Sequence, residues 1–272
     1  MYKKKKGFRI FCAIICALML LGATCVSANA ETKAYNWYCV HAKGHIQPKV
    51  NSELAFVEEL GGYYIDHRHT EESDAQKVIY LTFDVGYENG NVAKVLDVLK
   101  EENVSGTFFV LGHVIEKESE LVKRMVAEGH TVGNHTVRHK DMSAASGDIL
   151  LAELKELEDK YYNLTGEPMQ KLYRPPEGSF SKENLETLYE NGYQTVFWSF
   201  AYPDWDNHRQ MSPEKAKQII LDNAHNGEVM LLHPTSRVNA EILSSVIVEL
   251  KAQGYRFGRI QELVQNDLAR AE

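Results

Sequence analysis

Residues Tyr80-Leu-Thr-Phe-Asp-Val-Gly-Tyr-Glu-Asn-Gly90 carry the strongest fold signal in this chain of 272 residues. Apolar, β-branched and aromatic residues fill positions 78–83 and stop at Asp84, which predicts a buried strand with a carboxylate at its carboxyl end. Two glycines then allow a turn, and residues 91–100 have the apolar spacing of a helix. Ligands of α/β folds bind where strands end and helices begin, so Asp84 is a candidate acid, base or metal ligand. Taken alone, it is more simply a helix-capping residue.

Strand and helix patterns alternate from this stretch to the end of the chain. Glycines stop several of the predicted helices, and Ser212 followed by Pro213 marks a helix start. Repeated strand–helix units with short connections predict a parallel sheet or a barrel. The expected strands cover residues 78–83, 106–111, 130–134, 195–200, 228–232 and 256–258, and the expected helices cover residues 91–100, 119–128, 149–162, 182–190, 213–223, 240–253 and 260–268.

Length and charge narrow the class of protein. The chain is long enough for one large α/β domain or two small ones. Its formal net charge of −8 argues against binding nucleic acid or an anionic polymer through bulk positive charge. A sugar substrate in a local cleft is compatible with this charge. The sequence leaves the oligomeric state open.

The amino terminus has the pattern of an export signal. A basic segment (3–9) precedes a short apolar segment (10–23), and Ala28-Asn29-Ala30 offers small residues for cleavage after Ala30. An uncleaved membrane anchor is the alternative, because the apolar part can be extended over residues 8–26. Either way the rest of the chain is expected to work outside the cytoplasm. Three of the four cysteines lie in this segment, so Cys39 would have no partner for an internal disulfide.

Residues 31–76 are polar and mixed, and we expect them to form a strap packed on the main domain. A helical patch at residues 54–60 and the aromatic segments Asn36-Trp-Tyr38 and Gly61-Gly-Tyr-Tyr64 support packing rather than a free linker. The strap also contains four histidines that could be metal ligands, although exposed loop histidines are common. They are His41, His45, His67 and His69.

Polar residues recur at the carboxyl ends of successive predicted strands. One end of a closed barrel would bring these side chains together, which is the strongest functional pattern in the sequence. The residues concerned are Asp84, His135, His139, Arg174, Asp204, Trp205 and His233.

The segment His135-Thr-Val-Arg-His139 places two imidazoles four residues apart. On a helical turn both would point the same way, within reach of one ion. Neutral imidazoles suit zinc and similar divalent ions. A pair of surface histidines is the alternative, but the position directly after a strand favours a metal site.

Arg174 precedes two prolines, which hold it on a stiff, extended backbone. A fixed guanidinium there could pin Asp84 and keep it ionised as a base; a structural salt bridge is the alternative. His233 follows a buried strand and could donate a proton to a leaving amine, or could be a satisfied core histidine. Tyr87 and Trp205 are candidates, with Tyr202, for an aromatic wall that stacks on a sugar.

Five segments, in order, resemble the motifs of the polysaccharide deacetylases, also called carbohydrate esterase family four. The resemblance covers about residues 77–264 and implies a distorted (β/α) barrel of about seven strands, formed by residues 77–272. In this sequence the motifs are Thr82-Phe-Asp-Val-Gly86, His135-Thr-Val-Arg-His139, Arg174-Pro-Pro-Glu-Gly178, Ala201-Tyr-Pro-Asp-Trp205 and Leu231-Leu-His233.

The resemblance also implies roles for these residues. It implies a divalent metal, usually zinc, on the two histidines of the second motif, and hydrolysis of an acetyl amide to a free amine and acetate. The implied roles are Asp84 as general base, His233 as general acid, Arg174 as the residue that orients the base, Asp204 as the partner of the acid, His135 and His139 as metal ligands, and Tyr87, Pro175, Trp205 and Leu231 as substrate-binding residues.

Two positions depart from the family pattern. Val85 stands where the family has its third metal ligand, and valine cannot bind a metal, so water, substrate or another residue such as Glu88 would have to substitute. Ala201 stands where the fourth motif has its first acid, and Asp204 could take over the tuning of His233.

Both departures, with the segment 86–90, resemble one subgroup, the delta-lactam-biosynthetic de-N-acetylases of spore-forming bacteria. The subgroup implies an exported enzyme that removes acetyl from N-acetylmuramic acid in peptidoglycan glycan strands, as a step towards muramic δ-lactam in spore cortex, in the cell wall or the space around the forespore. The alternatives are a deacetylase of N-acetylglucosamine or of O-acetyl xylan, and a cell-wall binding protein that has lost activity with its third metal ligand.

Overall fold

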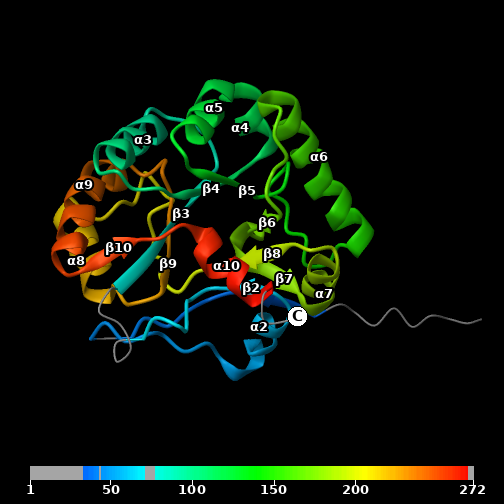
Figure 1. Ribbon diagram of the computed structural model, residues 1–272, viewed down its shortest axis with the longest axis horizontal. Helices are drawn as coiled ribbons and strands as arrows, with labels where there is room; N and C mark the ends of the chain where they lie inside the picture. The colour runs from blue at the N-terminus through cyan, green and yellow to red at the C-terminus, as the bar shows by residue number, and fades with distance from the viewer. Residues whose placement is uncertain (1–32, 43, 71–76, 269–272) are drawn as a thin grey trace, which may run out of the picture. The chain divides into compact units, whose positions relative to one another are not determined.

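The computed structural model describes residues 33–268 except 43 and 71–76. These belong to one compact unit, Lys33–Glu272. Its centre is a curled parallel sheet of eight strands, seven of them from residues 77 onward, surrounded by helices (Figure 1). The expected barrel of about seven strands is therefore confirmed. The export signal predicted for residues 1–30 lies outside the described residues.

The strand β3 (Lys77–Val85) is the central strand of the sheet. One side of β3 pairs with β10 (Tyr255–Phe257) and then with β4 (Thr107–Val110), and the other side pairs with β9 (Glu228–Leu232). From β4 the sheet continues through β5 (Thr131–Asn134), β6 (Leu172–Tyr173), β8 (Gln194–Val196) and β2 (Gly62–Tyr63). All these pairings are parallel, so the carboxyl ends of the strands lie at one end of the sheet.

Isolated bridges, not a full ladder, close the curl between β8 and β9. Beyond β8 the chain makes a parallel bridge from Phe200 to Met230, and at the opposite end Ile65 makes an antiparallel bridge to Glu228. The strap therefore fills the gap between β8 and β9 at the amino end of the barrel. At the carboxyl end the chain after β8 joins β9 through Ser199 and Phe200, whose backbone N–H groups donate to the Val229 carbonyl.

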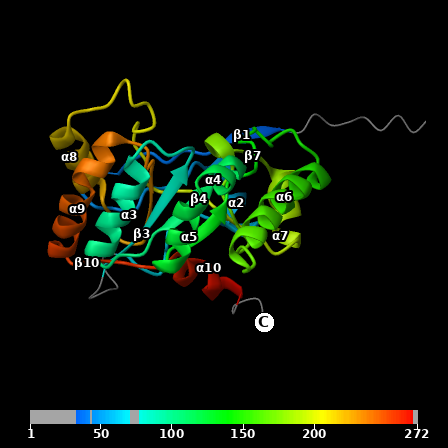
Figure 2. The same cartoon turned by 90° about the horizontal axis from the view of Figure 1, so that it is seen from above.

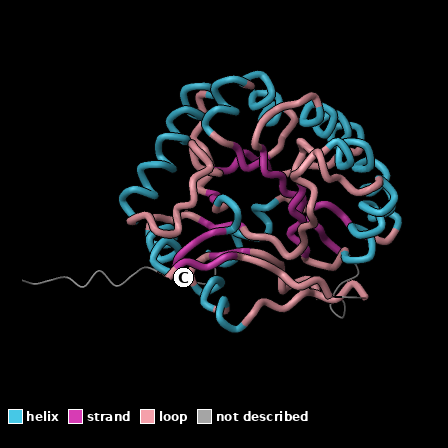
Figure 3. The backbone as a smooth tube through the Cα atoms, turned by 180° about the vertical axis from the view of Figure 1, so that it is seen from behind, coloured by secondary structure: helices cyan, strands magenta, loops and turns pink. Residues whose placement is uncertain are grey.

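Amphipathic helices cover the outside of the sheet because each buries one apolar side against it. Figures 2 and 3 show them arranged around the strands. Their positions match the predicted periodicity closely, and Ser212 caps its helix by accepting from the Lys215 backbone N–H. The helices are α3 (Asn91–Glu101), α4 (Gly112–Lys117), α5 (Ser119–Ala127), α6 (Gly147–Thr165), α7 (Lys182–Glu190), α8 (Pro213–Asn223), α9 (Arg237–Ala252) and α10 (Ile260–Leu268).

The helix α10 covers the amino end of the barrel rather than its outer surface (Figure 1). Its Ile260 and Leu263 pack into one buried cluster with Tyr80 of β3 and Val229 of β9. The hydroxyl of Tyr80 donates to the buried carboxylate of Asp66 in the strap at 2.7 Å. This end of the barrel is thus closed by apolar packing and by a buried polar contact, and the functional groups lie at the other end.

The strap packs on the barrel along its described length. The strand β1 (Ala34–Asn36) pairs with β7 (Ser179–Ser181), which follows the short turn η2 (Pro176–Gly178). The predicted helical patch forms η1 (Ser52–Leu54) and α2 (Phe56–Glu59). Cys39 is a free, partly buried thiol. Among the described residues, no helix is both long and apolar enough to cross a membrane.

Two local predictions are wrong. Residues 197–200 do not continue the strand β8, because their backbone bonds go to other partners, as the site below shows. His135 and His139 do not lie on a helical turn: residues 135–142 form an irregular loop in which Thr136 and His139 have positive φ angles of 70° and 53°.

The crossing of the strap over the barrel makes a prediction about Gly227. This glycine has φ +76°, and a Cβ atom there would lie 2.3 Å from the backbone oxygen of Asp66. Gly227→Ala is expected to lower the free energy of unfolding by about 2 kcal/mol or more, measured by chemical denaturation.

The matched control is Gly254→Ala, where φ is +89° but a Cβ atom would meet nothing within 4 Å. The control carries only the cost of the left-handed backbone, roughly 1 kcal/mol. Equal losses in the two variants would contradict a close approach of strap and barrel at Gly227.

Candidate active site

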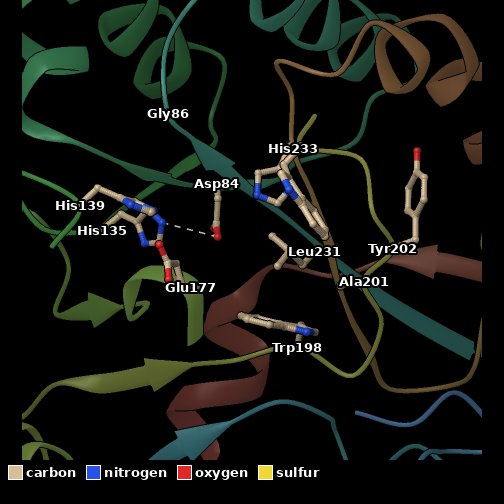
Figure 4. A pocket seen from close by; sticks show the side chains of 11 residues that line it. Asp84, Gly86, His135, His139, Glu177, Trp198, Ala201, Tyr202, Leu231 and His233 are labelled. Atoms are coloured by element: carbon tan, nitrogen blue, oxygen red, sulfur yellow. Dashed lines mark ion pairs between the residues drawn. The ribbon is translucent and has the colours of Figure 1, made fainter. Parts of the chain in front are cut away.

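A cavity of about 570 Å³ opens at the carboxyl ends of the strands. Its lining combines titratable groups with aromatic and aliphatic side chains, as expected for a small-molecule or sugar site. The lining residues are Asp84, Gly86, His135, His139, Glu177, Trp198, Ala201, Tyr202, Trp205, Leu231 and His233. The predicted convergence of polar residues from separate strand ends is therefore confirmed (Figure 4).

Asp84 is held by a fully buried arginine. Nη1 of Arg174 donates to Oδ1 of Asp84 at 2.9 Å. The other guanidinium nitrogens donate to backbone carbonyls of the segment after β8, Nε to Val196 at 2.8 Å and Nη2 to Phe197 at 3.0 Å. Burial raises the pKa of Asp84, but the charge and hydrogen bond of Arg174, together with the charges of His135 and His233, outweigh burial and lower the pKa. Asp84 is thus an ionised, oriented carboxylate.

The two histidines of the second motif meet despite the irregular loop. Their ring centroids lie 5.0 Å apart, and Nε2 of His135 lies 3.6 Å from Oδ2 of Asp84 (Figure 4). Nδ1 of His135 donates to the Arg174 carbonyl at 2.8 Å, which leaves Nε2 as the nitrogen with a lone pair. Burial lowers the pKa of His135 to about 4, so this imidazole is neutral near pH 7. Neutral imidazoles are what a divalent metal requires.

His233 stands across the cavity from the two histidines and carries its own carboxylate partner (Figure 4). Nδ1 of His233 donates to Oδ1 of Asp204 at 2.7 Å, and the His233 backbone N–H donates to Oδ2 at 2.7 Å. The side chain of Asn239 also donates to Oδ2, at 2.6 Å. Burial of the imidazole opposes its charged form, but Asp204 outweighs this and raises the pKa of His233. His233 is therefore suited to hold a proton.

Three asparagines that the sequence reasoning missed join the loops of the acid and the base. The side-chain amides of Asn89, Asn91 and Asn207 all donate to the backbone carbonyl of Thr235, at 2.9 to 3.0 Å. Asn89 and Asn91 follow Asp84, while Thr235 lies two residues after His233. The asparagines within and after the segment 86–90 were the only available signal, and nothing in the sequence indicates their common acceptor.

The predicted substrate-binding residues lie at different depths. Leu231 and Trp205 line the cavity, and Trp205 is 60% exposed at its edge. Neither Tyr87 nor Pro175 lines the cavity. Tyr87 is exposed, and Pro175 is buried. The sequence reasoning missed two further lining residues, Trp198 and Glu177.

Neither Val85 nor Glu88, the residue expected to substitute for the third metal ligand, lines the cavity. Val85 is buried in the apolar cluster under the outer helices. The carboxylate of Glu88 accepts from the backbone N–H of Gly90, within its own turn. Across the part of the chain that the structure describes, no three His, Cys, Asp or Glu side chains are grouped to hold an ion. The site thus offers two imidazoles and leaves the remaining positions to water or substrate.

The strap histidines have other contacts. His41 and His45 donate to the backbone carbonyls of Ala201 and Ala224, at 3.0 and 2.6 Å. His67 lies 2.6 Å from the carboxylate of Glu58, and His69 lies 3.8 Å from that of Asp66. These four residues are spread along the strap and do not form one cluster.

An ionised carboxylate and an imidazole suited to hold a proton therefore face one cavity, with the imidazoles of His135 and His139 beside them. This arrangement can activate a water, protonate a leaving group and hold a divalent ion. It defines a hydrolase built on an α/β barrel.

Comparison with known proteins specifies the family. The sequence profile of the polysaccharide deacetylases matches residues 71–196. The chain is 40% identical to peptidoglycan-N-acetylmuramic acid deacetylase PdaA of Bacillus subtilis, over 93% of this chain and 95% of the relative. It is 33% identical to a peptidoglycan-N-acetylglucosamine deacetylase of Bacillus cereus, over 70% of this chain and 89% of the relative. The solved structure of B. subtilis PdaA, a family 4 carbohydrate esterase, matches with a TM-score of 0.80 and 39% identity, covering 86% of this chain and 98% of the other.

The chain belongs to the polysaccharide deacetylase family, carbohydrate esterase family four. The family is generally metal-dependent. The expected family and class of enzyme are thus confirmed.

The geometry predicts how His233 titrates. Replacing Asp204 by asparagine removes the negative charge that favours the imidazolium, so the pKa of His233 is expected to fall. The measurement is an NMR titration of the His233 ring in both proteins. Asp206→Asn is the control, because the Asp206 carboxylate accepts from the His208 backbone N–H at 2.8 Å and lies 3.8 Å from Arg209, and among the described residues it makes no hydrogen bond to His233. An unchanged His233 titration in Asp204→Asn would contradict the assigned pair.

Proposed function

We propose that this protein is a peptidoglycan N-acetylmuramic acid deacetylase, which hydrolyses the N-acetyl amide to a free amine and acetate. The observation that carries the proposal is the pair of Asp84 and His233, oppositely tuned by Arg174 and Asp204 across one cavity. The choice of muramic acid is supported by the similarity to PdaA along nearly the whole chain. The product would be a step towards muramic δ-lactam in spore cortex.

In the proposed reaction one proton is transferred on each side of the cavity. Asp84 takes a proton from the attacking water, since Arg174 keeps the carboxylate ionised and oriented. His233 holds a proton on Nε2, the nitrogen that does not face Asp204, and gives it to the amine as the C–N bond breaks. Leu231 and Trp198 supply apolar surface beside the acetyl group.

The imidazoles of His135 and His139 would hold the metal, with zinc as the expected ion. A bound divalent ion supplies positive charge that stabilises the developing oxyanion. With two protein ligands in place of three, weaker metal binding is expected than at a site with a third carboxylate.

The export pattern of the amino-terminal sequence supports an exported enzyme that acts on glycan strands of the cell wall. We propose a signal or anchor in residues 1–30, the strap in residues 31–76 and the deacetylase domain in residues 77–272. Peptidoglycan is the proposed partner, with membrane contact limited to the signal or anchor, and the place of action is the wall or the space around the forespore.

The first test is product analysis. Residues 31–272 are incubated with peptidoglycan stripped of stem peptides, and the muropeptides are analysed by mass spectrometry. Loss of one acetyl group from muramic acid is expected, and Asp84→Asn is expected to lower the rate about a hundredfold or more, because the base is lost.

The same assay on chitooligosaccharides separates the alternatives. Activity on these alone would replace muramic acid by N-acetylglucosamine as substrate. No activity on either, with binding to cell walls unaffected by Asp84→Asn, would favour a wall-binding protein that has lost catalysis.

The second test concerns the metal. His139→Gln removes one of two imidazole ligands, so zinc affinity is expected to fall about tenfold or more, measured by competition with a chelating dye. His208→Gln, at an exposed loop histidine outside the cavity lining, is the control and should bind zinc like the wild type. Equal affinity in all three proteins would place the metal elsewhere.

A further inference from the structure

The wall of the cavity opposite Asp84 is an irregular segment, residues 197–202, which contributes Trp198, Ala201 and Tyr202 to the lining. A segment that leaves a sheet must find other partners for its backbone carbonyls. On the inner side the partner is Arg174, whose guanidinium donates to the carbonyls of Val196 and Phe197, as described above. The next carbonyls outward face the strap.

Two strap side chains bond these outer carbonyls. Nε1 of the buried Trp37 donates to the Trp198 carbonyl at 2.9 Å, and Nε2 of His41 donates to the Ala201 carbonyl at 3.0 Å. Both rings also stack on the segment, Trp37 on Phe197 with centroids 4.4 Å apart and His41 on Phe200 at 5.0 Å. The wall is therefore bonded from inside by Arg174, from outside by the strap, and in its middle by β9, where the Ser199 N–H donates to the Val229 carbonyl and the Phe200 carbonyl accepts from the Leu231 N–H.

Trp37 also holds the neighbouring part of the wall. Its backbone N–H donates to the Gly178 carbonyl at 2.9 Å, directly after the lining residue Glu177. A Cβ atom at Gly178 would lie 2.9 Å from the ring of Trp198 and 3.2 Å from Cβ of Trp37. One strap residue thus joins the turn after Arg174 to the segment that carries Trp198.

We propose that Trp37 and His41 are positioning residues for substrate binding, which set the place of Trp198 in the cavity although neither residue lines it. Asp84 and His233 come from β3 and β9 and have no hydrogen bond to either strap residue among the described contacts. The strap therefore acts first on the segment that carries Trp198, and it reaches the acid and the base only through the hydrogen bonds of this segment to Arg174 and to β9. This inference rests on the proposed function for its kinetic part only.

The test uses Trp37→Phe, which keeps an aromatic ring but removes the N–H bonded to the Trp198 carbonyl. KM for stripped glycan strands is expected to rise about three- to tenfold, a larger factor than the fall in kcat, because the Trp198 backbone loses its bond to the strap while Arg174 and β9 still hold the segment on the side of the reacting groups. His41→Phe keeps the stack on Phe200 and is expected to raise KM in the same direction. His41 is exposed, so its replacement leaves the packed core of the protein intact.

The matched control is Tyr64→Phe. The Tyr64 ring packs 5.0 Å from Trp37 in the same cluster, but its hydroxyl bonds to Glu58 and not to the wall. This variant loses a strap hydrogen bond and should leave KM unchanged.

A second readout does not depend on activity. The chain has three tryptophans, so the indole N–H signals of ¹⁵N-tryptophan-labelled protein can be followed singly. In Trp37→Phe the signal of Trp198 is expected to shift while that of Trp205 stays in place. An unmoved Trp198 signal, or a lower melting temperature with unchanged KM, would overturn the proposal. If the wild type removes no acetyl group, the proposed function fails, and the Trp198 signal still decides the role of the strap.

Discussion

The buried ion pair between Arg174 and Asp84 is the interaction on which the rest of the site depends. Arg174 is fully buried, and removal of one partner of such a pair typically costs about 3–5 kcal/mol because the other charge is left unpaired. The remaining nitrogens of the guanidinium donate to the backbone carbonyls of Val196 and Phe197, at the end of β8. The same side chain therefore orients the base and holds the backbone at the end of β8, where the wall of the cavity begins.

The site divides into two halves with opposite electrostatic tasks. On one half, Arg174 lowers the pKa of Asp84 and burial keeps His135 neutral. On the other half, Asp204 raises the pKa of His233. One cavity can thus contain a base that is free of its proton and an acid that carries one at the same pH. The shared Thr235 carbonyl, with its three asparagine donors, holds the loops of the two halves together.

The departures from the family pattern look different once the fold is known. Val85 packs into the apolar cluster beneath the helices, so its replacement of an acid is accommodated by packing and not by another ligand nearby. Ala201 lines the cavity, where its small side chain leaves space, and Asp204 alone pairs with His233. The strap, which lies largely outside the residues matched by the family profile, supplies bonds to the cavity wall.

The order of strands and helices, the barrel and the gathering of Asp84, Arg174 and His233 followed from sequence alone. Periodicity is a local property, and the carboxyl ends of parallel strands must share one end of a sheet. Only the tertiary structure decided the course of residues 197–200 and the loop of His135 and His139. Strand propensity favoured a continuous strand over residues 197–200, and the spacing of His135 and His139 favoured a helical turn. In the structure, the carbonyls of Phe197 and Trp198 accept hydrogen bonds from Arg174 and Trp37, which are buried and distant in the chain. Such partners leave no periodic trace in a sequence, because hydrogen bonds between distant segments depend on how the whole chain packs.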